Sequence, residues 1–138
     1  MLTLEEAITW FNTVASKVKE VPNANRRRQL AAILLSLFQR AYIDLLRKKY
    51  KSKEYMPIIP TREDHFAAES LAMFLLTIKD EEERAAYIAR LYEAMQYYFE
   101  NFEEFKFERV EDILSFKNFH KVLSKINAIL APAQFFDE

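Results

Sequence analysis

Glycine and cysteine are both absent from the 138 residues of this chain. An average protein contains about 7% glycine, which β-hairpins use in tight turns and phosphate-binding loops use where the backbone approaches the ligand. The absence of glycine therefore argues against a β-rich fold and excludes the usual Walker-type and Rossmann-type nucleotide sites. The absence of cysteine excludes disulfides, thiolate metal sites and thiol nucleophiles, and it fits an intracellular or thermophilic protein.

Long hydrophobic runs are also missing, so we expect no transmembrane helix and no membrane partner. The first six residues include Glu5 and Glu6 and lack the basic start of a signal peptide, which predicts a cytoplasmic protein. Apolar residues make up 51% of the chain and charged residues 30%, a composition typical of a globular protein with a core. The length predicts one domain, residues 1–138.

Apolar residues recur at helical spacing along most of the chain, which predicts an all-α fold. We expect a single-domain bundle of five to six helices around one central buried helix. That central helix is the segment 26–51, which is apolar almost all round between Leu30 and Leu46. The expected helices cover about 4–21, 26–51, 62–78, 81–102, 110–114 and 116–131, with an extended crossover at 55–60.

Polar residues mark the start of each main helix. Thr3 with Glu6, and Thr61 with Asp64, have the spacing of a capping box, and Asn25 and the acidic run from Asp80 suit the other two helix starts. The residues expected in the core are Ala7, Phe11, Val14 and Val18; Leu30, Ala31, Leu34, Leu35, Phe38, Ala41, Tyr42, Leu45 and Leu46; Phe66, Ala67, Leu71, Phe74, Leu75 and Ile78; and Ile88, Leu91, Met95, Tyr98, Phe99 and Phe102.

The net charge of −1 conceals an asymmetry along the chain. Residues 1–53 contain eleven Lys and Arg against four Asp and Glu, a net charge of +7, whereas residues 54–138 contain nine against seventeen, a net charge of −8. The acidic half can be a solvated surface or can meet the basic half of a second copy or another subunit, and the second interpretation predicts head-to-tail stacking.

Positive charge gathers at the two ends of the segment 26–51. Gln29, Ser36, Arg40, Arg47 and Lys51 fall in one stripe about 33 Å long, which could follow a phosphate backbone. These cations can also be ordinary solvated side chains, but three arginines at the positively charged start of a helix are locally unfavourable and point to an anionic partner. The candidate nucleic-acid-binding residues are Arg26, Arg27, Arg28, Arg40, Arg47, Lys48, Lys49, Lys51 and Lys53.

Twelve Phe, seven Tyr and one Trp supply a large aromatic content, most of it at core spacing. Tyr50 and Tyr55 are different because they alternate with lysines, a composition typical of surfaces where bases stack beside neutralised phosphates. They are the candidate stacking residues, and Trp10 is a third aromatic side chain outside the core pattern.

No catalytic motif or metal site is found in the sequence. His65 and Glu69 share a helical face but lack a third ligand at helical spacing, and a zinc or iron site needs at least three. The other histidine, His120, fits a boundary or surface position, and the serines and histidines form no recognisable catalytic motif. We therefore expect no enzyme activity, no cofactor and no bound metal.

In length, helical pattern and the basic segment Arg26–Lys53 set against an acidic half, the chain resembles the small helical subunit of CRISPR effector complexes. The resemblance is one of architecture and transfers no individual residue. It implies a subunit of a ribonucleoprotein in antiviral defence, packed beside other protein subunits and holding a crRNA-guided duplex or a displaced single strand.

Two functions are consistent with the sequence. The first is a non-catalytic, nucleic-acid-binding structural subunit that contacts the DNA or RNA backbone through the basic helix. The second is a helical protein–protein interaction module, such as a viral or plasmid regulator or inhibitor, that does not touch nucleic acid. Joint exposure of Tyr50, Tyr55 and Ile58 as one patch would favour the second function.

Overall fold

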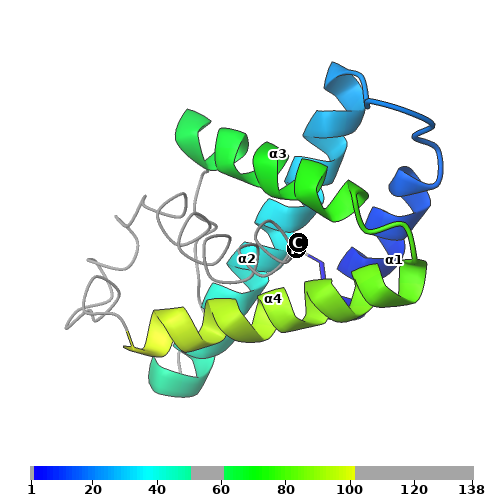
Figure 1. The fold of residues 1–138 in the computed structure, drawn as a ribbon. Coiled ribbons are helices and arrows are strands. Elements are labelled where there is room, and N and C mark those ends of the chain that lie inside the picture. Colours follow the sequence, from blue (N-terminus) through cyan, green and yellow to red (C-terminus); the bar gives the residue numbers. More distant parts are fainter. Residues whose placement is uncertain (1, 51–60, 102–138) are drawn as a thin grey trace, which may run out of the picture.

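The computed structural model describes residues 2–50 and 61–101, and over these residues the chain is all-helical. Four helices follow in order: α1 (Leu4–Ala15), α2 (Ala24–Tyr50), α3 (Arg62–Leu76) and α4 (Glu81–Asn101). α2 contacts each of the other three, with α3 and α4 crossing it at different levels (Figure 1). The helices expected over 110–114 and 116–131, and the crossover at 55–60, lie outside the described residues.

The expected capping boxes are present at the starts of α1 and α3. The hydroxyl of Thr3 accepts a hydrogen bond from the Glu6 backbone N–H at 3.1 Å, and the Glu6 carboxylate accepts one from the Thr3 N–H at 3.2 Å. Thr61 and Asp64 make the same reciprocal pair at 3.2 and 2.8 Å. These bonds satisfy backbone donors that have no partner within the helix, so both helix starts are fixed by local sequence.

α2 begins two residues earlier than its expected start. The side chain of Asn23 accepts from the Arg26 N–H at 2.9 Å, and its carbonyl accepts from the Arg27 N–H at 3.0 Å. Asn23 is therefore the N-cap, and the prediction that Asn25 caps this helix is wrong. The preceding Pro22 ends the loop, and an asparagine directly after it reaches the exposed N–H groups of the first turn.

Without glycine, α1 and α3 end on a hydroxyl side chain. Ser16 donates from its hydroxyl to the Thr13 carbonyl at 2.7 Å, and Thr77 does the same to the Phe74 carbonyl at 2.6 Å. At each end the backbone also closes into tighter i→i−3 bonds, from Lys17 N–H and from Thr77 N–H. α1 therefore stops at Ala15 rather than near 21, and α3 at Leu76 rather than at 78.

One hydrophobic core includes residues from all four helices. Most of the described residues expected there are buried, while Ala67 packs against its edge and Val18, beyond the end of α1, is half-buried. The side chains of Leu46, Tyr98, Phe99 and Phe102 lie outside the described set. Two alanines of α3, Ala68 and Ala72, are fully buried and were not expected. Small residues on the buried face of α3 allow its backbone to lie close to α2. Expected core residues that are buried include Ala7, Phe11, Leu30, Leu34, Phe38, Tyr42, Leu71, Leu75, Ile88, Leu91 and Met95.

A buried arginine joins α1 to the start of α4. Arg84 donates to the Asn12 side-chain oxygen at 2.7 Å and to the Ile78 carbonyl at 2.9 Å. Its side chain is 5% exposed, and this desolvation lowers its pKa. Because its side chain is buried and hydrogen-bonded within the protein, Arg84 is a structural residue that ties the loop before α4 to α1.

Candidate nucleic-acid interface

Among the described residues, two of the three arginines at the start of α2 hydrogen-bond to neutral groups. Arg26 donates to the side-chain oxygen of Gln29 at 3.1 Å, and Arg27 donates to the backbone carbonyl of Pro22 at 2.9 Å. Arg28 is exposed. Both acceptors are neutral, so they orient the guanidinium groups without cancelling the charge. These contacts also give Arg26 and Arg27 a structural reason to be there, which the sequence did not reveal.

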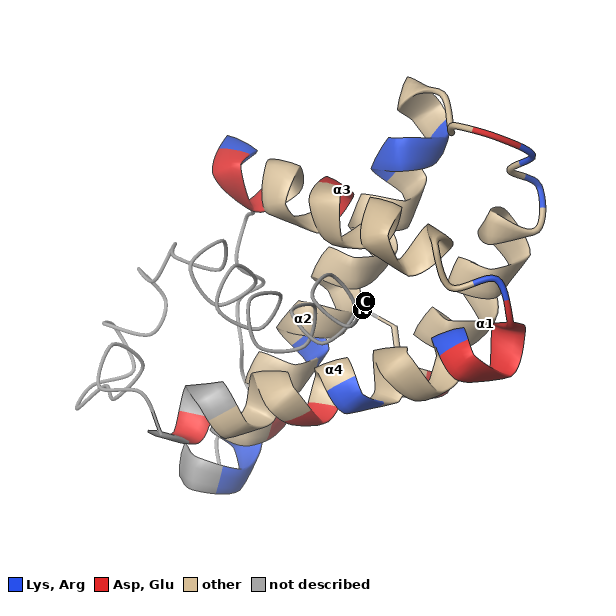
Figure 2. Cartoon of the chain, in the orientation of Figure 1, with Lys and Arg blue, Asp and Glu red and all other residues tan. Residues whose placement is uncertain are grey.

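Across from this turn, the first half of α3 forms the second wall of an open groove of about 850 Å³. The N-terminal halves of α2 and α3 diverge from their crossing (Figure 1). Residues from both of these halves line the groove. Lysine and arginine colouring marks the first turn of α2 and the start of α3 on the two arms (Figure 2). The groove is lined by Ala24, Arg27, Arg28 and Ala32 from α2, and by Arg62, His65, Phe66 and Glu69 from α3.

The groove lining is cationic. It contains three arginines and one glutamate, a net charge of +2 when His65 is neutral. The sequence predicted Arg27 and Arg28 but missed Arg62, because that residue lies thirty-four positions beyond Arg28 in the half of the chain that is acidic overall. Only the packing of α3 against α2 places these guanidinium groups around one space.

Phe66 was expected in the core, and the structure shows that this prediction is wrong. Its side chain is 54% exposed, and the Arg62 guanidinium lies over the ring at 5.3 Å from the centroid. The buried face of α3 follows Asp64, Ala68 and Leu71. Phe66 lies two residues beyond Asp64, about 200° around the helix and so on the opposite side.

The fully buried residues Asp64, Ala68 and Ala72 follow one another at intervals of four and therefore share one face of α3. The size of Phe66 suggested burial more strongly than two alanines did, which is why the sequence pattern misplaced it.

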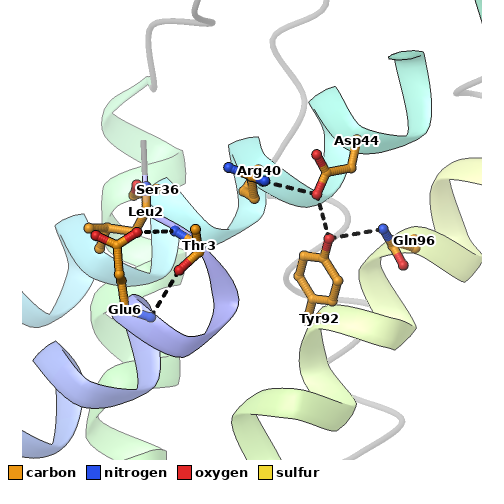
Figure 3. Close-up of polar contacts among 8 residues, drawn as sticks. All are labelled: Leu2, Thr3, Glu6, Ser36, Arg40, Asp44, Tyr92 and Gln96. Atoms are coloured by element: carbon orange, nitrogen blue, oxygen red, sulfur yellow. Dashed lines mark hydrogen bonds and ion pairs between the residues drawn. The ribbon is translucent and has the colours of Figure 1, made fainter. Parts of the chain in front are cut away.

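Midway along α2, Arg40 belongs to a polar network within the protein (Figure 3). Its Nε donates to Asp44 Oδ2 at 3.0 Å, and the hydroxyl of Tyr92 donates to the same oxygen at 2.7 Å. The Gln96 amide in turn donates to the Tyr92 oxygen at 3.1 Å. Burial, followed by the bond to Asp44, raises the pKa of Tyr92 to about 12. The charge of Arg40 is therefore paired with a carboxylate.

The expected basic stripe along α2 is interrupted at its centre. The Leu2 backbone N–H donates to the Ser36 hydroxyl at 2.9 Å, so the segment before α1 lies over this part of the helix (Figure 3). Glu6 is nearby, and its pKa is lowered chiefly by the backbone hydrogen bond with Thr3, with a smaller contribution from Arg40. The middle of the expected stripe is therefore contacted at Ser36 by the segment before α1, and Arg40 is paired with Asp44.

Two of the remaining candidate residues belong to the C-terminal end of α2 and have described side chains. Arg47 and Lys48 are exposed there, about 30 Å from the first turn at 1.5 Å per residue. Lys49 and Tyr50 belong to α2, but their side chains are outside the described set, as are Lys51, Lys53 and Tyr55. Joint exposure of Tyr50, Tyr55 and Ile58 is likewise outside the described residues.

A second hollow, of about 520 Å³, lies at the start of α4. Its lining includes Lys79 and Arg90 but also Asp80 and Glu83, so its charges balance. The Asp80 carboxylate already accepts the N–H groups of Glu82 and Glu83 at 2.8 and 3.0 Å. This hollow therefore lacks the excess positive charge of the groove between α2 and α3.

Within residues 2–50 and 61–101, no cluster of three or more metal-ligating side chains occurs. His65 and Glu69 both line the groove, where they lie with arginines rather than with further ligands. Across the same ranges, none of the helices has the length and apolar character needed to span a membrane.

Comparison of the chain with protein families, curated proteins and solved structures finds no match.

Proposed function

We propose that this protein is a non-catalytic nucleic-acid-binding protein and that it holds the phosphate backbone in the groove between α2 and α3. The observation that carries the proposal is the convergence of Arg27, Arg28 and Arg62 around one open groove. Guanidinium groups form paired hydrogen bonds with phosphate oxygens and stay charged at any physiological pH, which makes them suited to this ligand.

The groove is partly preorganised for an extended anion. Arg27 donates to the Pro22 carbonyl, and Arg62 lies within the capping box formed by Thr61 and Asp64. Because these local bonds already fix the backbone and one guanidinium, less conformational freedom is lost when a phosphate binds. Contacts to phosphate carry no sequence information, so binding is insensitive to base sequence.

Three arginines give modest affinity, which favours action within a larger assembly. Backbone contacts of this kind reach dissociation constants of about 10⁻⁴–10⁻⁶ M at physiological salt. We therefore propose a structural subunit of a ribonucleoprotein, consistent with the resemblance to the small subunit of CRISPR effector complexes. Arg47 and Lys48 would meet a more distant part of the same strand or duplex, and the full chain would form a bundle of five to six helices around α2.

Binding of fluorescent oligonucleotides, single-stranded and duplex, followed by anisotropy between about 50 and 200 mM salt, tests this function. We expect affinity to fall steeply with salt. The double variant Arg28→Ala/Arg62→Ala should lose at least tenfold in affinity at low salt, and the log–log salt slope should become shallower by about 2.

The matched control is Lys17→Ala/Lys19→Ala, which removes two exposed cations from the loop after α1. This variant should bind as the parent protein does. Absence of binding to any oligonucleotide at low salt, or an equal loss in both double variants, would show that the groove does not hold nucleic acid.

A further inference from the structure

Phe66 is the one groove residue whose side chain is large, apolar and more than half exposed. Isolated exposed apolar residues are common on protein surfaces and need no explanation. This one lies in the same groove as three arginines, and one of them, Arg62, is stacked on its ring at 5.3 Å. Phe66 is therefore not an isolated exposed residue, because its ring lies in one groove with three guanidinium groups.

An aromatic ring beside cationic groups can bind both parts of an unpaired nucleotide, the base and the phosphate. The base stacks on the ring while the adjoining phosphates pair with the cations. In a duplex the base faces are already stacked on their neighbours, so a phenyl ring reaches only base edges or the sugar–phosphate backbone. Exposure of Phe66 therefore contributes to binding a single strand and contributes little to binding a duplex.

Glu69 gives the groove a direction. It lies seven residues after Arg62 on the same wall, about 10 Å further along α3. Its carboxylate repels phosphate at that end, so phosphates are favoured near Arg62 and near Arg28 on the opposite wall. Phe66 lies between Arg62 and Glu69 in the helix and is thus next to the favoured phosphate positions.

We propose that the groove between α2 and α3 binds single-stranded nucleic acid in preference to duplex, with one unpaired base stacked on Phe66. This inference rests on the proposed function, because stacking matters only if the arginines hold phosphates. Phe66 has no hydrogen-bonding group, so stacking on it does not select one base over another through hydrogen bonds. The preference is for strandedness rather than for sequence.

The test compares a single strand of about 12 nucleotides with a hairpin duplex of similar charge, using Phe66→Ala and Phe66→Leu. Both variants remove the ring, and the second keeps apolar volume. We expect each to weaken single-strand binding by about tenfold or more, with the salt slope unchanged, and to alter duplex binding by less than about twofold. Because Phe66 is exposed, both variants should keep the parent helicity by circular dichroism.

The matched control is Trp10→Ala, which removes an aromatic side chain that is also 54% exposed but lies on α1 away from the groove. It should leave both affinities unchanged. Trp10 is the only tryptophan, so Trp10→Phe/Phe66→Trp places a single fluorescent reporter in the groove. Its emission should be quenched by the single strand and much less by the duplex.

Equal losses for single strand and duplex, or no loss for either, would overturn the stacking inference. If Arg28→Ala/Arg62→Ala nevertheless abolished binding, the groove would bind nucleic acid without base stacking on Phe66, and the proposed function would stand. No binding of either oligonucleotide to the parent protein would overturn both. Binding of an acidic, tyrosine-containing copolymer that depends on Phe66, without oligonucleotide binding, would replace nucleic acid by a protein partner.

Discussion

In the first turn of α2, Arg26 and Arg27 donate to an amide oxygen and a backbone carbonyl, whereas midway along the same helix Arg40 donates to the carboxylate of Asp44. Neutral acceptors orient a guanidinium group and leave its field intact. A carboxylate cancels most of that field beyond a few ångströms. Arginines of one helix therefore differ in how strongly they attract an anion. The charge of each arginine's hydrogen-bond acceptor determines this strength.

The surroundings reinforce this difference. Around Arg40, the side chains of Asp44, Tyr92 and Gln96 form a chain of hydrogen bonds between α2 and α4. Arg28 instead lines the open groove, whose opposite wall belongs to α3. The middle of α2 uses polar groups to hold helices together, and its beginning leaves cations facing solvent.

The largest effect that would sharpen this comparison is expected for Asp44→Ala. The change removes the acceptor of both Arg40 and Tyr92, each partly buried, and should lower the free energy of unfolding by about 2 kcal/mol in urea denaturation. Oligonucleotide affinity should be unchanged or slightly higher, because the charge of Arg40 is released. Glu93→Ala, an exposed carboxylate on α4, is the control and should have little effect on stability. A marked fall in oligonucleotide affinity would contradict the separation of the two regions.

A smaller effect should separate two neighbouring arginines. Arg27→Ala removes the bond to the Pro22 carbonyl and should cost about 1 kcal/mol of stability, whereas Arg28→Ala, at an exposed position, should stay within about 0.5 kcal/mol of the parent. Each should make the salt slope of oligonucleotide binding shallower by about 1. Urea denaturation measures the free energy of unfolding, and anisotropy titration measures the salt slope. Equal stabilities for both variants would show that the bond between Arg27 and the Pro22 carbonyl does not stabilise the fold.

The smallest effect is a pH dependence in the network around Arg40. The pKa of Tyr92 is raised to about 12 in the folded state from an ordinary value of 10. A phenol whose folded pKa is raised stabilises the protein fully below about pH 10, and this contribution is lost as the pH rises through about 12. The stability difference between the parent and Tyr92→Phe should therefore shrink by less than about 1 kcal/mol between pH 8 and pH 11, measured by urea denaturation. A difference that is constant with pH would show that burial and the bond to Asp44 do not raise the pKa of Tyr92.

How far the sequence predicts this fold depends on the strength of the local signals. Capping boxes at Thr3 and Thr61 and the acidic start at Asp80 fix three helix starts, because each uses side chains within three residues of the backbone groups that they bind. The ends at Ser16 and Thr77 were missed because a hydroxyl bonded to a carbonyl is a weaker sequence signal than glycine or proline.

The sequence predicted the groove residues on α2 but not those on α3. Arg27 and Arg28 stand out by their placement at a helix start, where positive charge is unfavourable. Arg62 and Phe66 come to the same groove through the crossing of α3 with α2, and no local pattern encodes a contact between segments more than thirty residues apart. Likewise, the pairing of Arg40 with Asp44 has ordinary i, i+4 spacing, but Tyr92 joins it from another helix.

The buried alanines of α3 have a consequence for the shape of the binding surface. Ala68 and Ala72 lie on the face that packs against α2, and the groove opens toward the helix starts from there. A bulkier side chain at either position would push α3 away from α2 and tilt it. Since Arg62 lies about 9 Å along the helix from Ala68, a small tilt there becomes a larger displacement of the guanidinium group. The two alanine methyl groups therefore set the width of the groove between α2 and α3.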